Sequence, residues 1–370
     1  MTRQLLSTHA IILAGGRGTR FWPRSRTRTP KQLLNIVGKT TMLEQTVARL
    51  RPLLPADHIW SVTNTEQAAA LRKQLPVAAR RRVLTEPAGR NTAAAIALAA
   101  IHVRHAAKGD ALLAVLPADH YIARPELYRE IVRAAFQVAQ DPERMVVLGV
   151  PPTRPETGFG YVERMGEPLQ VNGHPVYAVR RFAEKPQLEI ARQYIATGDY
   201  QWNAGMFFWR VSTFLEALKK FLPKTYDALE GLSAHIGKRT YDATLKKIYR
   251  KLENISVDYA VLERATREEG PSRVFVIPAD IGWSDIGSWA AVYELVATQA
   301  DENVLAGHGQ TLDATGNFFW SPDKFVAAIG VRDLVVVETP DALLICPRER
   351  AQDVSKLVKA LEEKKLKKLL

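Results

Sequence analysis

The first half of the chain alternates short apolar runs with longer amphipathic stretches. A short apolar run bounded by turn residues predicts a buried strand, and apolar residues spaced three or four apart predict a helix. This alternation predicts an α/β fold, in which a Rossmann-like, mostly parallel sheet is flanked by helices and ligands bind beyond the carboxyl ends of the strands. The predicted strands are residues 11–14, 59–63, 82–85, 111–116 and 145–150, and the predicted helices are residues 40–50, 66–75 and 126–139.

The second half continues the pattern and then changes near residue 301. Beyond that point short apolar runs are interrupted by Gly, Asp and Pro, which predicts strands and turns. We therefore expect residues 1–300 to form the main domain and residues 301–370 a small β-rich region that ends in a basic helix. The other predicted elements are extended segments at 176–183 and 274–277 and helices at 188–197, 211–221 and 241–252. For the aromatic run at 202–209, a role in the hydrophobic core alone is one interpretation.

Composition is that of a globular protein. The chain has 370 residues, of which 46% are apolar and 24% are charged. Its one cysteine, Cys346, excludes an intrachain disulfide, and its apolar surroundings predict a buried packing role. No apolar run approaches the roughly 18 to 20 residues of a membrane span, and no leader pattern opens the chain. We expect a cytoplasmic enzyme with no membrane partner.

The net charge of +12 favours anionic partners. Part of the excess lies in residues 356–368, where lysines alternate with apolar residues at helical spacing, as on the solvated face of an amphipathic helix. Aromatic residues are not interleaved with the basic ones as stacking platforms would require. We therefore expect small anionic ligands and no nucleic acid.

A glycine-rich segment follows the first predicted strand. Gly15, Gly16 and Gly18 make a loop whose N–H groups can contact a phosphate chain. Six cations follow closely, and an anion would relieve their mutual repulsion. A turn without any ligand is the plain alternative, because the spacing fits neither GxGxxG nor GxxxxGK[ST]. The cations are Arg17, Arg20, Arg24, Arg26, Arg28 and Lys31.

The segment GGRGTRFWP…PK resembles the signature of the sugar-1-phosphate nucleotidylyltransferases. In its longer form, LAGGRGTRFWPRSR…PKQ, it is similar to the mannose-1-phosphate guanylyltransferase branch. The resemblance implies that the loop holds a nucleoside triphosphate and that Arg20 and Lys31 act at the reacting phosphate. The implied nucleotide-binding residues of the loop are Gly15, Gly16, Arg17 and Gly18.

Residues 86–100, EPAGRNTAAAIALAA, form a polar turn followed by an Ala-rich stretch that predicts a helix opening near Asn91 and Thr92. Simple capping by Asn or Thr is one interpretation. The other is base recognition, because a carboxylate can accept hydrogen bonds from guanine N1–H and its amino group. The resemblance favours the second interpretation and implies nucleotide-binding roles for Glu86, Arg90, Asn91 and Thr92.

Two aspartates are candidate metal ligands. Asp119 directly follows a buried strand in the motif LPADH, where it could be a turn residue or could reach phosphates through Mg²⁺. The resemblance implies that Asp119 and Asp285, in GWSDIGSW, hold one ion. Their spacing cannot establish that convergence. We expect His120 to make only a local polar contact.

Three later motifs resemble the sugar-phosphate site of the same family. Gly158 in TGFGY would pass over the sugar, although loop chemistry explains its glycines equally well. Glu184 and Lys185 in FAEKP could be a surface ion pair, or could bind sugar hydroxyls and phosphate respectively. Asn203 in WNAG would bind the sugar, and Asp258 would orient the pocket or cap a helix.

The reaction implied is transfer of GMP from GTP to mannose 1-phosphate, giving GDP-mannose and pyrophosphate with Mg²⁺ as cofactor. The alternatives are another hexose 1-phosphate or nucleotide, and a catalytically silent regulator that binds a GDP-sugar. A homodimer is the candidate assembly. The region beyond residue 301 is too short for the isomerase domain of bifunctional relatives, so we expect guanylyltransferase activity alone.

Overall fold

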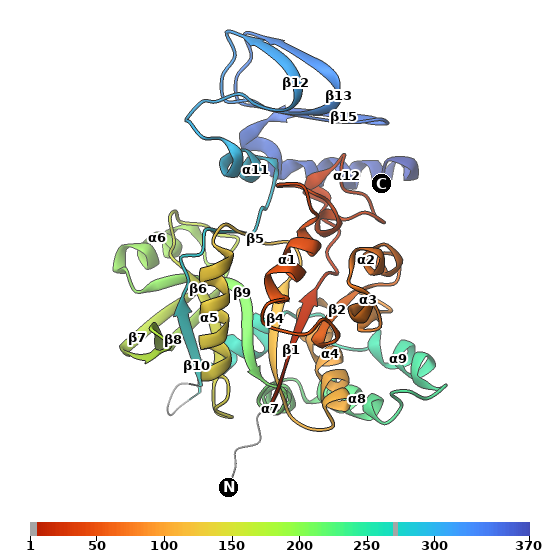
Figure 1. Cartoon of the computed structure of the whole chain (residues 1–370), viewed down its shortest axis with the longest axis vertical. Helices are drawn as coiled ribbons and strands as arrows, with labels where there is room; N and C mark the ends of the chain where they lie inside the picture. Colours follow the sequence, from red (N-terminus) through yellow and green to blue (C-terminus); the bar gives the residue numbers. More distant parts are fainter. Residues whose placement is uncertain (1–5, 269–272) are drawn as a thin grey trace.

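The computed structural model describes residues 6–268 and 273–370. Its centre is a nine-stranded sheet in the order β3-β2-β1-β4-β9-β6-β10-β8-β7 (Figure 1). The pairs β1–β2, β1–β4, β2–β3 and β6–β10 are parallel. The strands are β1 (Ser7–Leu13), β2 (Ile59–Asn64), β3 (Val83–Glu86), β4 (Ala111–Pro117), β6 (Met145–Val150), β7 (Gly160–Val171), β8 (His174–Glu184), β9 (Tyr200–Arg210) and β10 (Val274–Pro278).

The predicted α/β class is confirmed, but two strands run against the others. β9 is antiparallel to both β4 and β6, and β8 is antiparallel to β10 and β7. The aromatic run of β9 is buried in mid-sheet, with Phe208 and Trp209 fully enclosed. A strand buried on both faces shows no alternation of polar and apolar residues, so its direction cannot be read from the pattern.

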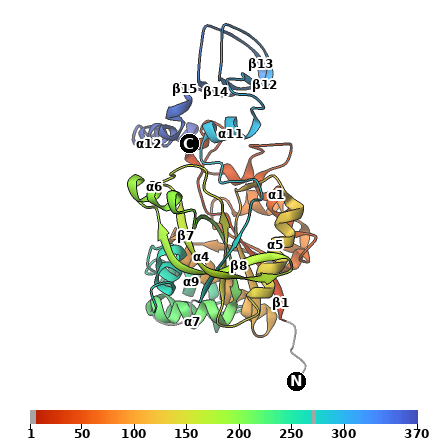
Figure 2. The ribbon, with the colours of Figure 1, turned by 90° about the vertical axis from the view of Figure 1, so that its left-hand side faces the viewer.

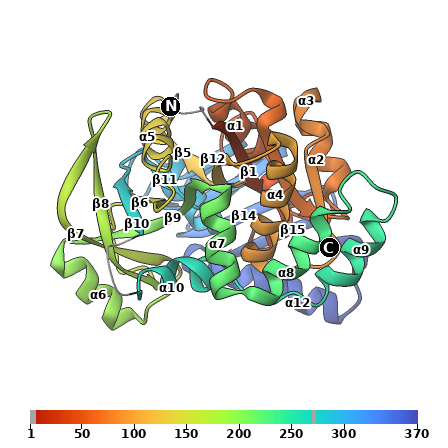
Figure 3. The same ribbon diagram turned by 90° about the horizontal axis from the view of Figure 1, so that it is seen from below.

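Helices cover both faces of the sheet (Figure 3). One face carries α1 (Met42–Leu50), α2 (Ala68–Gln74), α3 (Val77–Arg80) and α5 (Pro125–Val138). The other carries α4 (Asn91–Ala107), α7 (Val211–Phe221), α8 (Pro223–Ser233) and α9 (Tyr241–Tyr249). α6 (Leu188–Thr197) leads into β9, and the short α10 (Glu263–Ala265) packs beside β8.

Sequence signals explain several of the helix boundaries. Thr41 caps α1 in a reciprocal capping box with Glu44, and Gly198 ends α6 in the left-handed conformation. The prediction missed α8, which begins at Pro223 directly after α7 ends.

The C-terminal region forms a separate four-stranded sheet above the main one (Figure 2). Its strands β12, β13 and β14 are parallel, and β15 is antiparallel to β14. Cys346 in β15 packs against the hydrophobic cluster of this region, as predicted, but it is only half-buried. The elements are α11 (Trp289–Val296), β12 (Val304–Leu312), β13 (Phe318–Ile329), β14 (Leu334–Thr339), β15 (Ala342–Pro347) and α12 (Val354–Glu363).

The end of the chain packs against its beginning. α12 lies beside the segment that follows β1 (Figure 1), with Glu362 on Arg17 at 2.6 Å. The Trp22 indole N–H donates to the carbonyl of Leu369 at 2.8 Å. The C-terminal region therefore braces the predicted phosphate loop. Across the residues that the structure describes, no helix has the length and apolar character needed to cross a membrane.

Candidate active site

A cavity of about 550 Å³ opens where β1, β3 and β4 end. Its walls come from the glycine loop, the start of α4 and the β7–β9 hairpins. A smaller hollow of about 330 Å³ adjoins it and shares His120 and Asp285. The cavity brings together the predicted residues Gly15, Gly16, Glu86, Arg90, Asn91, Thr92, Gly158, Glu184, Asn203 and Asp285, and the smaller hollow holds Gly18, Arg20, Lys31 and Asp119.

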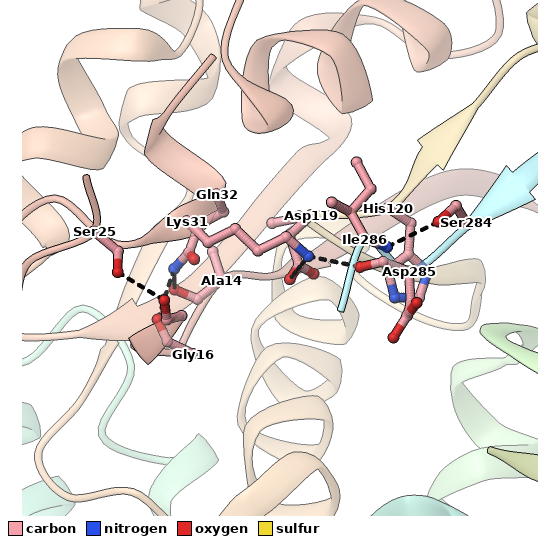
Figure 4. Close-up of polar contacts among 12 residues, drawn as sticks. Ala14, Gly16, Ser25, Lys31, Gln32, Asp119, His120, Ser284, Asp285 and Ile286 are labelled. Atoms are coloured by element: carbon pink, nitrogen blue, oxygen red, sulfur yellow. Dashed lines mark hydrogen bonds and ion pairs between the residues drawn. The ribbon is translucent and has the colours of Figure 1, made fainter. Parts of the chain in front are cut away.

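Polar side chains hold the glycine loop (Figure 4). The Gln32 amide donates to the carbonyls of Ala14 and Gly16, at 2.8 and 3.0 Å. The Ser25 hydroxyl donates to the Gly18 carbonyl at 2.7 Å. Gly18 has a φ of 61°, and a Cβ there would lie 2.5 Å from that of Lys31. Only glycine fits at position 18, and its lack of a side chain lets the loop pack directly against Lys31.

Lys31 lies at the junction of three segments. It sits in a 3₁₀ turn, Lys31–Leu33, and is buried despite its charge. Its ammonium donates to Asp119 Oδ2 at 2.8 Å and to the Asp285 carbonyl at 2.6 Å. Figure 4 shows its side chain reaching toward both aspartates. Residues 88 and 254 positions apart from Lys31 thus meet at one ammonium group.

The two aspartates have opposite pKa shifts. Burial alone would raise the pKa of Asp119, but the Lys31 ammonium outweighs burial and lowers it. Burial raises the pKa of Asp285, and the Asp119 charge adds to the rise. A cation beside a buried carboxylate stabilises its ionised form. Two carboxylates at the edge of a phosphate loop also suit Mg²⁺, which takes few protein ligands and keeps phosphate and water oxygens.

His120 makes local contacts. Its Nδ1 accepts from the Trp283 indole at 3.0 Å, where the ribbon of β5 (Tyr121–Ile122) and β11 (Trp283–Ser284) begins. Its carbonyl accepts from Arg49 at 3.1 Å. Burial lowers its pKa to about 4, so the ring is neutral at pH 7. These contacts agree with the predicted local role.

Arg17 and Arg20 lie at the rim of the site. Arg17 is paired with Glu362 of α12 and does not line the large cavity. Arg20 is exposed and lines the smaller hollow beside Lys31. Arg20 is therefore near the aspartates, whereas Arg17 faces the C-terminal helix.

One end of the cavity contains the predicted base-binding residues. Glu86 ends β3 and is 8% exposed. Its Oε1 accepts from the Tyr249 hydroxyl at 2.7 Å, and burial raises its pKa to about 7. The Arg90 guanidinium donates to the carbonyls of Tyr249 and Arg250 at the end of α9.

Asn91 and Thr92 open α4 as predicted. Asn91 has a φ of 61°, and its side chain accepts from the Thr92 N–H at 2.9 Å. The Thr92 hydroxyl accepts from the Val257 N–H at 2.9 Å. Neither side chain caps α4, because the cap position is Arg90 and it has no side-chain cap hydrogen bond, so the structure does not support simple capping by Asn or Thr.

Of the predicted sugar residues, Glu184 and Asn203 line the cavity, whereas Lys185 is exposed and does not line it. Lys185 reaches Glu184 Oε1 at 2.6 Å, while Glu184 Oε2 is buried without a hydrogen bond in the described part of the chain. Asn203 donates to Asp258 at 2.8 Å. Burial raises the pKa of both Glu184 and Asp258, and the charge of Asp258 raises the pKa of Glu184 further. An acceptor with an unused oxygen suits a sugar hydroxyl.

Asp258 does not cap the following helix. It lies inside a π-helical turn, Asp258–Leu262, whose cap position is Val257. This observation favours the interpretation in which Asp258 orients the pocket through Asn203.

Two site residues were missed by the sequence reasoning. Tyr249 had no signal, because its partner Glu86 is 163 positions away. Gly160 lies in the TGFGY motif, and a Cβ there would lie 2.5 Å from Glu184 Oε2 and 3.2 Å from Asn203 Cβ. The second glycine of the TGFGY motif was therefore the sequence signal that could have identified Gly160 as a site residue. Gly158 also lines the cavity, and its N–H donates to Glu156 at 3.0 Å.

The chain has clear relatives. A sequence model described as nucleotidyl transferase matches residues 9–302, and one described as MannoseP isomerase/GMP-like beta-helix domain matches residues 308–361. Mannose-1-phosphate guanylyltransferases from Escherichia coli K12 and Klebsiella pneumoniae are 38% and 39% identical. The alignments cover 96% and 95% of this chain, and 73% and 74% of theirs. A solved structure from Thermus thermophilus, titled mannose-1-phosphate geranyltransferase, has 35% identity and a TM-score of 0.85 over 96% of this chain and 100% of its own.

A glycine loop on a helix-flanked sheet, matched over nearly 300 residues, makes this protein a nucleotidyltransferase. Enzymes of this class generally use a divalent metal ion. Within that class, the chain belongs to the mannose-1-phosphate guanylyltransferase family.

Proposed function

We propose that the protein transfers GMP from GTP to mannose 1-phosphate and releases GDP-mannose and pyrophosphate. The observation that carries the proposal is the position of Lys31, whose ammonium donates to the Asp119 carboxylate and to the Asp285 main-chain carbonyl in the hollow beside the cavity. Glu86, Glu184 and Asn203 line the cavity and Lys31 lines the hollow that adjoins it, which supports placing the reacting phosphates near Lys31.

The chemistry needs positioning and charge more than a protein nucleophile. The phosphate of mannose 1-phosphate is already ionised and would attack the α-phosphorus of GTP in line, with pyrophosphate leaving. Lys31 and Arg20 would offset the negative charge at the α-phosphate and the leaving group. Lys185 would hold the acceptor phosphate, while Glu184 and Asn203 would bind sugar hydroxyls.

Asp119 and Asp285 are the residues that would hold Mg²⁺. The ion would supply charge neutralisation for the phosphates when bound. The glycine loop, Gly15, Gly16 and Gly18, would contact the triphosphate, and Gly158 would lie over the sugar. Glu86 and Arg90 would bind guanine or its ribose side, with Arg17, Asn91 and Thr92 at the rim. We further propose that residues 1–300 carry this chemistry and residues 301–370 brace it.

A substrate panel tests the proposal. Pyrophosphate release is measured for GTP, ATP, UTP and dTTP, each with mannose, glucose and galactose 1-phosphate, in Mg²⁺. We expect the highest kcat/KM for GTP with mannose 1-phosphate. Preference for another pair would reassign the substrates, and absence of turnover with tight GDP-mannose binding would identify a silent regulator.

A further inference from the structure

The last turn of α9 holds two charged residues of the base end at once. Tyr249 donates its hydroxyl to Glu86, and the carbonyls of Tyr249 and Arg250 accept from Arg90. A helix C-terminus carries partial negative charge, which suits a guanidinium. α9 contributes none of the motifs recognised in the sequence, yet it fixes the base-binding residues from behind.

Glu86 has two possible hydrogen-bonding states, which fit different bases. An ionised carboxylate only accepts, and guanine offers two donors on one edge, N1–H and the 2-amino group. A protonated carboxyl both donates and accepts, which matches adenine, with its N1 acceptor and 6-amino donor. The protonation state of Glu86 would therefore affect which purine fits.

Burial and Tyr249 have opposite effects on the protonation of Glu86. Burial raises the pKa of Glu86 to about 7, whereas the hydrogen bond from Tyr249 favours the ionised form. Tyr249 is itself fully buried, and its own pKa is raised, so it stays protonated and remains a donor. Tyr249 on α9 and Gly15 after β1 lie against Glu86, and the charge of Arg90 acts on Tyr249.

We propose that Tyr249 is a positioning residue for purine selection, which holds Glu86 in the accepting form that guanine requires. The proposal rests on the function proposed above and assigns its specificity to a residue outside the recognised motifs. Tyr249 touches Glu86 and not the reacting phosphates, so its loss should affect nucleotide choice and leave the chemical step nearly unchanged.

The test compares Tyr249→Phe with Tyr241→Phe. Tyr241 lies on the same helix and makes an equally short hydrogen bond, 2.7 Å, but to His102, outside the cavity. For Tyr249→Phe we expect kcat/KM with GTP to fall on the order of tenfold, mainly through KM. The GTP-to-ATP ratio should fall, with ITP, which lacks the 2-amino group, less affected than GTP. Tyr241→Phe should keep the native ratio.

The pH profile separates positioning from packing. Because the lost hydrogen bond stabilised the ionised form, the midpoint at which kcat/KM for GTP rises with pH should move to higher pH in Tyr249→Phe. Thermal melting checks that the variant is folded. An unchanged GTP-to-ATP ratio and an unchanged midpoint in a folded variant would overturn the proposal.

Glu86→Gln provides the second arm, should Tyr249→Phe fail to fold. A glutamine does not titrate, so the GTP-to-ATP ratio of this variant should not depend on pH between about 6 and 8, whereas the native ratio should. A native pH dependence that survives in Glu86→Gln overturns the proposal. If the native enzyme shows no preference for GTP, the proposed function itself fails. If it prefers GTP and folded Tyr249→Phe matches it, only the role of Tyr249 fails.

Discussion

Lys31 is a buried cation whose two hydrogen-bond partners, Asp119 and Asp285, come from separate parts of the chain. Replacing it by alanine removes positive charge at the reacting phosphates, so kcat should fall on the order of 10²- to 10³-fold. Pyrophosphate release under saturating substrates measures the loss. Lys39→Ala is the matched control, because Lys39 is exposed on the same N-terminal segment. Native turnover by Lys31→Ala would contradict its assigned role.

Gly160 allows Glu184 and Asn203 to pack closely against the backbone of β7. An added Cβ would lie 2.5 Å from Glu184 Oε2, so Gly160→Ala must displace that carboxylate. We expect KM for mannose 1-phosphate to rise on the order of tenfold while KM for GTP stays near its native value. Gly231→Ala, in α8 with open space around it, is the control. Equal KM values in both variants would show that the Glu184 position is unimportant.

At the residue scale, motifs predicted which side chains gather but not how each is held. Lys31 contacts the Asp119 carboxylate and the Asp285 main-chain carbonyl, although no spacing rule could bring positions 88 and 254 residues away to one ammonium group. Tyr249 escaped prediction, because a single tyrosine on a helix looks like any core residue. Arg17 pairs with Glu362 from the opposite end of the chain, a contact that only the folded protein creates.

At the element scale, the boundaries were predictable where local signals exist. Thr41 and Gly198 mark helix ends by capping chemistry that acts within a few residues. Strand direction was not predictable, since β9 is paired on both sides and its aromatic residues are buried on both faces. The order of strands in the sheet is set by long-range packing, which a local sequence pattern does not record.

α12 braces the segment after β1 through one of its faces. Val358 is buried there, whereas its neighbour Leu357 is 42% exposed. Val358→Ala should lower the free energy of unfolding by about 2 kcal/mol, because it removes buried methyl groups and leaves a small cavity. Leu357→Ala should change it by less than about 0.5 kcal/mol. Urea denaturation of the two variants measures the difference, and equal midpoints would refute this packing.

At the scale of the whole molecule, largely buried histidines couple stability to pH. Burial lowers the pKa of His102 from 6.5 to about 4. The unfolded chain therefore binds more protons than the folded one between these values, and stability falls as the pH drops through this window. Between pH 7 and 5 the His102 share of this loss is about 2 kcal/mol.

His102→Gln should remove the part of the pH-dependent stability loss that comes from His102. The variant should lose less stability than the native protein between about pH 7 and 5, as measured by urea midpoints at both values. His308→Gln, at an exposed position in β12, is the control and should retain the native difference. Glu86 acts in the opposite direction, because its raised pKa makes stability fall as pH rises toward about 7. A variant and control with the same pH response would contradict the assignment to His102.

The contact between Trp22 and Leu369 also has a consequence for synthesis of the protein. A ribosome makes the phosphate loop near the start of translation, but its brace emerges only with the last residues of α12 and the segment after it. The Rossmann-like sheet can assemble earlier, since its strands are complete by Pro278. A nascent chain at that stage would contain every proposed nucleotide-binding residue but would lack the contacts that support the loop. Full nucleotide-binding activity should therefore be reached only when translation has passed Leu369.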